Sequence, residues 1–298
     1  MKILESPIDY GSRDRYIRCQ TYSPVRRLEG LPHELFSTYW RDVHGPLCSR
    51  LPGLGFYVQH HFSREHSANL WGFASGVKPI DFVLDGAVEI GFANVEDMAA
   101  FSTASPILFG DEVNVFGWDA AFFLPNGSRT FVDQQVDGVP NGPDRLHRLH
   151  VYMHGSLDAS FRAWATGLAD QLGSNHAVRK LRLHLPETFD NANPQPPSPV
   201  DHFVIESMAK LAIMEIGFDS ALSARQFFET DAYKATLAGQ AEYVKAMKVV
   251  LVTGVYTFVR DGQPTIAGLR GSRAAEIIER VGATNHLADD VTRLFVSV

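Results

Sequence analysis

The chain has 298 residues, of which 45% are hydrophobic and 20% are charged, and its formal net charge is −7. Its length allows two domains of about 150 residues, and the acidic balance without a Lys/Arg-rich run argues against nucleic-acid binding. Neither a signal peptide nor an apolar run of about 20 residues that could span a membrane is evident, and the two cysteines lack metal-type spacing. We therefore expect a cytoplasmic protein with reduced thiols.

The first half alternates strand-like and helix-like patterns. Apolar spacing and β-propensity predict strands over 15–23, 56–61, 86–92 and 114–124, and helices over 36–47 and 95–101. A long loop over 63–85 separates the second and third strands, and loops of this length usually have a function or cover a site. The resulting order, βαββαβ, is that of a ferredoxin-like unit.

The second half repeats this order. Glu89 and Phe101 recur as Glu215 and Phe227, each 126 residues further on. His60 recurs as His184 after 124 residues, and Phe36 recurs as Phe161 after 125. Strands are predicted over 149–154, 178–185, 211–218 and 249–259, and helices over 159–172 and 224–237. The proline-rich loop 186–209 is expected to be a stiff, extended cover. Self-similarity of this kind indicates duplication.

A histidine lies on the apolar face of the helix predicted over 36–47. The members of this face recur at helical spacing: Phe36, Tyr39, Trp40, Val43, His44 and Leu47. Leu51-Pro52-Gly53 ends the helix, and the strand that follows ends in His60-His61. An imidazole facing an aromatic space can act as an acid or base near neutral pH. The alternative is a core histidine with a hydrogen-bonded partner.

These residues also carry a family resemblance. The pattern F-x-x-Y-W-x-x-x-H-x-P-L followed by L-P-G and an aromatic strand resembles the EthD-domain family, over residues 13 to about 125. That family belongs to the dimeric α+β barrel superfamily, and its domains generally pair as homodimers. The resemblance therefore implies an α+β fold in which two ferredoxin-like βαββαβ repeats form an intramolecular dimeric α+β barrel. The chain would then be a monomeric pseudo-dimer or a homodimer.

We predict three domains. Residues 1–135 form the EthD-like domain that carries the motif, 145–270 form a degenerate repeat, and 271–298 form a C-terminal helical extension in which Ser272 is a candidate N-cap. In the repeat, Leu168 or Ala169 takes the position of His44, and the L-P-G break is absent. One pocket is therefore expected, in the first half. The alternatives for the strand face of His150, Tyr152 and His154 are a second site or, as we favour, a solvated surface.

The catalytic candidates are His44 as acid or base, Tyr39 and Tyr57 as phenolic partners, and His60 as a second acid–base group. The substrate-binding candidates are Trp40, His61, Trp118, Asp119 and, as a lid residue in the long loop, Trp71. His60 is the weaker candidate because His184 repeats it, and the Glu89/Glu215 pair is interpreted as structural. Asp42 lies on another helix face and is not expected to orient His44.

No metal or cofactor is expected. His60, His61 and His66 are close in sequence, but adjacent strand residues point to opposite faces and do not bind one ion together. The chain has no H-E-x-x-H, C-x-x-C, nucleotide-binding glycine loop or G-x-S-x-G motif. Haem occurs in relatives within the superfamily, but nothing in this sequence identifies an axial ligand.

The remaining chemistry is cofactor-free proton transfer. A His/Tyr site suits a lyase or isomerase, of dehydratase or decarboxylase type, acting on a small aromatic, phenolic or cyclic compound. The resemblance points the same way, since EthD-domain relatives include dehydratases and decarboxylases of aromatic polyketide-like compounds, and neighbouring families include cofactor-independent monooxygenases and muconolactone isomerases. The alternatives are a cofactor-independent monooxygenase of an electron-rich phenol and a non-catalytic binder of an apolar small molecule.

Overall fold

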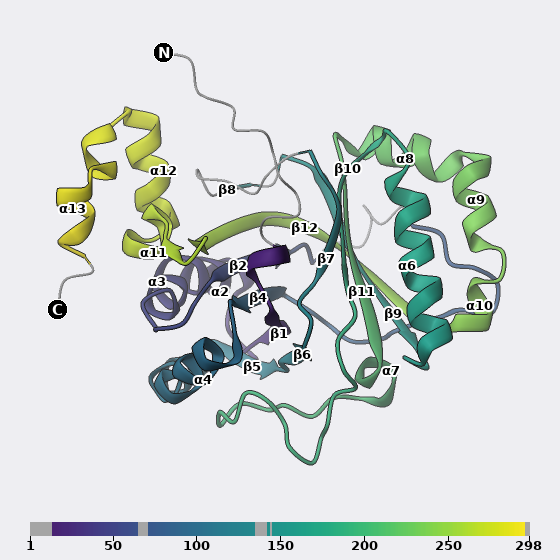
Figure 1. Cartoon of the computed structure of the whole chain (residues 1–298), viewed down its shortest axis with the longest axis horizontal. Helices are drawn as coiled ribbons and strands as arrows, with labels where there is room; N and C mark the ends of the chain where they lie inside the picture. The colour runs from purple at the N-terminus through teal and green to yellow at the C-terminus, as the bar shows by residue number, and fades with distance from the viewer. Residues whose placement is uncertain (1–13, 65–70, 135–141, 144, 296–298) are drawn as a thin grey trace.

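The computed structural model describes residues 14–64, 71–134, 142–143 and 145–295 (Figure 1). The first half has four main strand positions, the fourth of them split in two: β1 (Cys19–Arg27), β2 (Phe56–Phe62), β4 (Gly86–Phe92), and β5 (Phe116–Asp119) with β6 (Phe122–Leu124). Its helices are α2 (His33–Tyr39), η1 (Trp40–His44), α3 (Gly45–Cys48), α4 (Val95–Ala104) and α5 (Pro106–Glu112). Within the sheet, the strands lie in the order fourth, first, third, second, which is the ferredoxin-like arrangement.

The second half has the same strand order. Its strands are β9 (His147–Gly155), β10 (Val178–His184), β11 (Leu211–Phe218) and β12 (Val244–Arg260). Its helices are α6 (Ala159–Gly173), α7 (Glu206–Ala209), α8 (Ala221–Glu229), α9 (Asp231–Leu237) and α10 (Gln240–Tyr243). The helices of the two halves lie on opposite sides of the strands (Figure 1). The C-terminal helices α11 (Ile266–Arg270), α12 (Ser272–Val281) and α13 (Asp289–Arg293) lie on the side of the first half.

The fourth strand of each half joins the two repeats into a closed barrel. β12 has 17 residues and pairs first with β9 of its own half and then with β2 of the first half. On the other side, β7 (Arg129–Asp133) follows β6 and pairs with β10. Each second strand therefore finds its neighbour in the other repeat, which protects the strand edges from pairing with another chain. The short strands β3 (Lys78–Pro79), β8 (Gly142–Pro143) and β13 (Gln263–Pro264) add to β12.

Alternation along the strands separates the barrel interior from the layer under the helices. On β2, Phe56, Val58 and Phe62 pack inside the barrel with residues of the second half. Tyr57 belongs instead to a cluster on the helix side, and Gln59 donates to the backbone oxygen of Trp40 at 3.0 Å. A single strand thus contributes to two separate environments, which decides where each candidate residue lies.

The predicted fold class is confirmed, with several corrections to the elements. β1 lies four residues later than expected, because residues 14–16 form a helical turn before it. The sequence patterns do not predict α5 or β7. They predict α8 and α9 as one helix, although Thr230 ends the first and is the N-cap of the second. Gly271, not Ser272, is the N-cap of α12. The proposed division into three domains stays a prediction.

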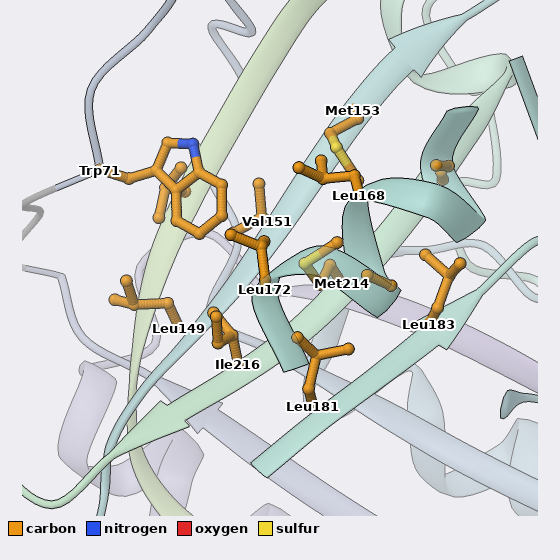
Figure 2. Packing of buried hydrophobic residues seen from close by; sticks show 14 of the residues in the cluster. Trp71, Leu149, Val151, Met153, Leu168, Leu172, Leu181, Leu183, Met214 and Ile216 are labelled. Carbon is orange, nitrogen blue, oxygen red and sulfur yellow. The ribbon is translucent and has the colours of Figure 1, made fainter. Parts of the chain in front are cut away.

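The layer between sheet and helices in the second half is a solid apolar core. Leu168 and Leu172 of α6 pack over strand residues that include Val151 and Ile216, as Figure 2 shows. Trp71, which lies in the first half's long loop, completes this core and is 5% exposed. Among the described residues, no helix is both long and apolar enough to cross a membrane.

Candidate active site

The corresponding layer of the first half contains a cavity of about 450 Å³. Its floor is the helix-facing side of the sheet, and its roof comes from η1, α3, α4 and α5. Its lining is mostly apolar and aromatic, with Trp40, Tyr57, Phe92, Phe101, Phe109, Phe116 and Phe123 among the members. A space of this size and character suits a small organic ligand with a flat, apolar body.

The second half contributes one wall. Gln195, Pro196 and Pro197 of the proline-rich loop line the cavity. The loop is fixed to the first half by three backbone hydrogen bonds, from Ala121 N to Gln195 O at 2.8 Å, from Asp119 N to Asp201 O at 3.1 Å and from Glu187 N to Phe123 O at 2.9 Å. The loop predicted to act as a cover therefore lies against the cavity, and both halves are needed to enclose it.

A π-helical turn brings His44 to this cavity. The backbone N–H of Gly45 bonds to the oxygen of Trp40, five residues earlier, and such turns recur at functional sites. Gly45 itself lies against the ring of Phe258 in β12, where a Cβ would overlap that ring. The glycine of the H-G-P segment thus lets this turn pack directly on the barrel, and His44 lines the cavity while only 5% exposed.

Asp111 on α5 orients His44. His44 Nδ1 lies 2.8 Å from Asp111 Oδ2, and the Tyr39 hydroxyl donates to Asp111 Oδ1. The hydrogen bond from His44 holds the pKa of Asp111 below its usual value, and the bond to Asp111 raises the pKa of Tyr39 to about 12. An ionised Asp111 favours the tautomer with the proton on Nδ1, which leaves Nε2 as the basic nitrogen.

A second acid–base group lines the same cavity. Burial, together with the nearby charge of Asp119, raises the pKa of Glu112 to about 8. Asp119 is paired with His202 of the covering loop, with 2.8 Å between Oδ1 and Nδ1. Burial disfavours the His202 cation, but its hydrogen bond to Asp119 outweighs this and raises its pKa to about 9. At neutral pH, Glu112 is therefore mostly protonated, and its Oε2 has no hydrogen-bond partner among the described residues.

The comparisons with known proteins agree with the motif and the fold. Residues 28–107, the segment that provides α2, η1, α3, β2, β4 and α4, match the EthD domain model. The first half carries an EthD domain. No curated protein sequence matches the chain.

Solved structures resemble this chain at low sequence identity. A protein from Fusobacterium nucleatum, named as a putative monooxygenase, has a TM-score of 0.50 and 6% identity over 84% of this chain and 97% of its own. One from Lactobacillus acidophilus, with the same description, has a TM-score of 0.46 and 11% identity over 81% and 96%. An anthrone oxidase-like protein gives 0.47 and 11% over 81% and 92%. At such identities the likeness concerns the fold.

The first half brings four of the predicted site residues to the cavity: Trp40, His44, Tyr57 and Asp119. Tyr39 reaches the site through Asp111 instead of lining the cavity. Tyr57 is fully enclosed, and its hydroxyl accepts from Gln59 Nε2 at 2.7 Å. Since burial raises the pKa of Tyr57 well above its usual value, this side chain is a neutral hydrogen-bonding group and not a proton-transfer group.

The other predicted site residues lie elsewhere. His60 points into the barrel, because it alternates with residues of the cavity side on β2. Trp118 packs in the same apolar cluster as Val58 and Phe62 of the barrel interior. The ring of His61 is stacked on that of Trp40, with 4.5 Å between their centroids, and lies behind the cavity lining. Its Nδ1 forms a hydrogen bond with the Ser37 hydroxyl. Trp71 is not a lid, since it packs against Phe228 and Tyr233 in the second half. His66 is outside the described residues.

Three further corrections concern residues that the sequence reading undervalued. Asp111 and Glu112 were missed, because they lie far from His44 in sequence and on a helix that was not predicted. An adjacent acidic pair at the end of a Pro-initiated helix was the available signal, and alone it is weak. The strand face of His150 and Tyr152 is not solvated, since both residues are fully buried inside the barrel.

Proposed function

We propose that the chain is an enzyme that moves protons on a small aromatic, phenolic or cyclic compound, as a cofactor-free lyase or isomerase of dehydratase or decarboxylase type. One observation carries this proposal. The His44–Asp111 pair opens on an apolar cavity that also holds a protonated carboxyl group, Glu112. A histidine oriented by a carboxylate and a carboxyl group that stays protonated at neutral pH, both in one apolar site, are the arrangement that general acid–base catalysis needs.

In a dehydration, each residue has a separate task. His44 Nε2 takes the proton from the carbon next to a carbonyl group, and the electron pair of that C–H bond forms the new C=C bond. The C–O bond to the neighbouring hydroxyl breaks, and Glu112 gives its proton to the departing hydroxide, which leaves as water. Solvent then removes the proton from His44 and restores the one on Glu112. Asp111 stabilises the imidazolium that exists between these steps.

The substrate class follows from the lining. Aromatic side chains favour a flat ring system, while Thr21, Ser23 and Tyr57 offer a few hydrogen bonds to oxygen substituents. The covering loop excludes bulk water on the side where it lies. Because both fourth strands close the barrel within one chain, we propose a monomeric pseudo-dimer as the working unit.

A cyclic β-hydroxy ketone that aromatises to a naphthol on losing water is a direct probe. We expect the purified protein to form the naphthol under anaerobic conditions, followed by absorbance, and His44→Gln and Glu112→Gln to abolish most of the turnover. His176→Gln, at an exposed histidine of the second half, is the control. Tight binding without turnover across a panel of such ketones and the matching β-keto acids would favour the non-catalytic binder instead.

The second candidate is a cofactor-independent monooxygenase. The same base can form a phenolate, and an apolar, aromatic-lined cavity suits both an electron-rich phenol and dioxygen. The fold that the chain shares with a protein named as a putative monooxygenase raises this alternative. An oxygen electrode separates the two, since an oxygenase consumes dioxygen with a dihydroxynaphthalene and stops when air is removed, whereas a lyase continues.

A further inference from the structure

The barrel interior holds a cluster of ionisable side chains that the proposed active site does not use. His60 of β2, His150 of β9 and His184 of β10 point into it, together with Glu89 and Glu215 of the two third strands, and none is more than 1% exposed. His60 and His184 are equivalent in the two repeats, as are Glu89 and Glu215. The cluster therefore lies where the two repeats meet, on the opposite face of the first-half sheet from the cavity.

Each imidazole uses one nitrogen for a neighbouring polar group. His150 Nδ1 lies 2.7 Å from the Tyr22 hydroxyl, His184 Nδ1 lies 2.7 Å from Ser128 Oγ, and His60 Nε2 lies 3.1 Å from Glu89 Oε1. The remaining nitrogens, His60 Nδ1, His150 Nε2 and His184 Nε2, have no hydrogen-bond partner among the described residues. Leaving one such atom buried without a partner is unfavourable. Three of them in one cluster therefore indicate that the cluster binds a ligand.

The spacing of the groups fits an ion. One candidate ligand atom from each of His60, His150 and Glu215 lies within 4.8 Å of the other two, and the same holds for Glu89, His184 and Glu215. We propose that the barrel interior binds a transition-metal ion, with His60, His150 and Glu215 as its ligands and His184 next to it as a fourth. A histidine ligand typically has its second nitrogen fixed by a hydroxyl or carboxylate, which is what Tyr22, Ser128 and Glu89 do here.

The chemistry of the ligands selects the kind of ion. Imidazole nitrogens suit zinc, copper, iron and nickel, whereas magnesium and calcium prefer all-oxygen sites. Arg148 pairs with Glu215 and Arg182 pairs with Glu89, so each carboxylate charge is already neutralised by an arginine. The remaining polar groups of the cluster are imidazoles, which favours an ion that prefers nitrogen ligands. His150 and His184 are also fully buried among apolar and aromatic side chains, and the neutral imidazole is the ligating form.

The ion would have a structural role. The ligands come from β2 of the first repeat and from β9, β10 and β11 of the second, so a bound ion joins the two halves. Ligands on four separate strands also produce no local spacing motif, which explains why the sequence indicated no metal site. Because the cluster is enclosed, we expect the ion to be taken up as the chain folds.

The test measures metal in the full chain after expression in medium supplemented with zinc, iron, copper, nickel and cobalt. We expect about one ion per chain by plasma mass spectrometry, a loss of at least about tenfold in His150→Phe, and no loss in His154→Gln. His154 is the matched control, because it lies on the same strand and its Nδ1 already contacts the Lys210 oxygen at 3.2 Å.

A second measurement covers the case in which His150→Phe does not fold. X-ray absorption of the wild-type chain should show nitrogen and oxygen neighbours at about 2.0–2.1 Å with imidazole scattering. The proposal is overturned if wild-type protein from every medium holds less than about a tenth of an ion per chain, in which case trapped water occupies the cluster. It is equally overturned if His150→Phe folds and keeps its metal, or if the absorption spectrum lacks imidazole.

Discussion

The two repeats share one strand order but use the layer between sheet and helices in opposite ways. In the second half this layer is filled by large apolar side chains of α6 and of β9, β10, β11 and β12, with Trp71 added from the first half's long loop (Figure 2). In the first half the same layer holds the cavity with His44, Asp111 and Glu112. A duplicated fold can thus place packing in one copy and ionisable groups in the other.

The helix after the first strand explains much of this difference. In the second half, α6 is one α-helix of 15 residues that buries Phe161, Ala165, Leu168, Ala169 and Leu172. In the first half, the equivalent segment is divided into α2, the π-helical η1 and α3. This division turns His44 toward the cavity at the place where α6 presents Leu168 to its core. The position of His44 in the cavity lining therefore depends on an irregular helix.

The largest expected effect comes from making the first half resemble the second. In His44→Leu, the base is replaced by the residue type of the second repeat, and we expect kcat/KM to fall by about 10²–10⁴. The free energy of unfolding should change by less than about 1 kcal/mol, because Leu fits an apolar lining. The naphthol assay and urea unfolding check the two parts. A variant that keeps wild-type turnover would exclude His44 as the base.

Trp71→Ala examines the packed side of the comparison. Removing this buried indole should lower the free energy of unfolding by about 3–5 kcal/mol, measured by urea denaturation. Phe101→Ala is the control, since Phe101 borders the cavity and its loss enlarges a space that already exists. We expect this change to be about 1–2 kcal/mol. Equal losses in the two variants would mean that the first-half layer is packed as tightly as the second.

Asp111→Asn separates positioning from catalysis. The amide can still bond to His44, but it loses the charge that fixes the tautomer and stabilises the imidazolium. We expect kcat to fall by about 10–10³-fold with little change in KM. Tyr39→Phe, which keeps Asp111 ionised, should reduce kcat less. If KM rises in Asp111→Asn while kcat is unchanged, Asp111 only supports the shape of the cavity.

Local patterns predicted the architecture well because each repeat alternates strongly and carries its anchors in register. β4 and β11 match their predicted ranges at both ends. The motif also pointed to His44, which lines the cavity, since helical spacing and an aromatic face are properties of a short segment. Both results depend on residues that are neighbours in sequence.

The parts that failed depend on contacts between distant segments. Asp111 and His44 are 67 residues apart in the sequence. The positions of His60 and His61 depend on which side of β2 faces the barrel. Trp71 is beside the second half because its loop crosses to that side, which neither composition nor periodicity encodes. The same reason hid the histidine cluster inside the barrel, whose members come from both repeats.

The cavity side of the comparison should also show a dependence of stability on pH, through Glu112. The folded state raises the pKa of Glu112 from 4.5 to about 8, so between these values the folded chain binds more protons than the unfolded chain. Stability from this group is therefore full below pH 4.5 and falls as the pH rises to about 8.

Glu112→Gln removes this dependence. As the pH rises, the melting temperature of the variant should therefore increase relative to that of the wild type. Glu229→Gln, at an exposed carboxylate of α8, should show a constant difference. If Glu112→Gln also gives a constant difference, Glu112 is ionised throughout this range, and the proton donor of the site must be another group.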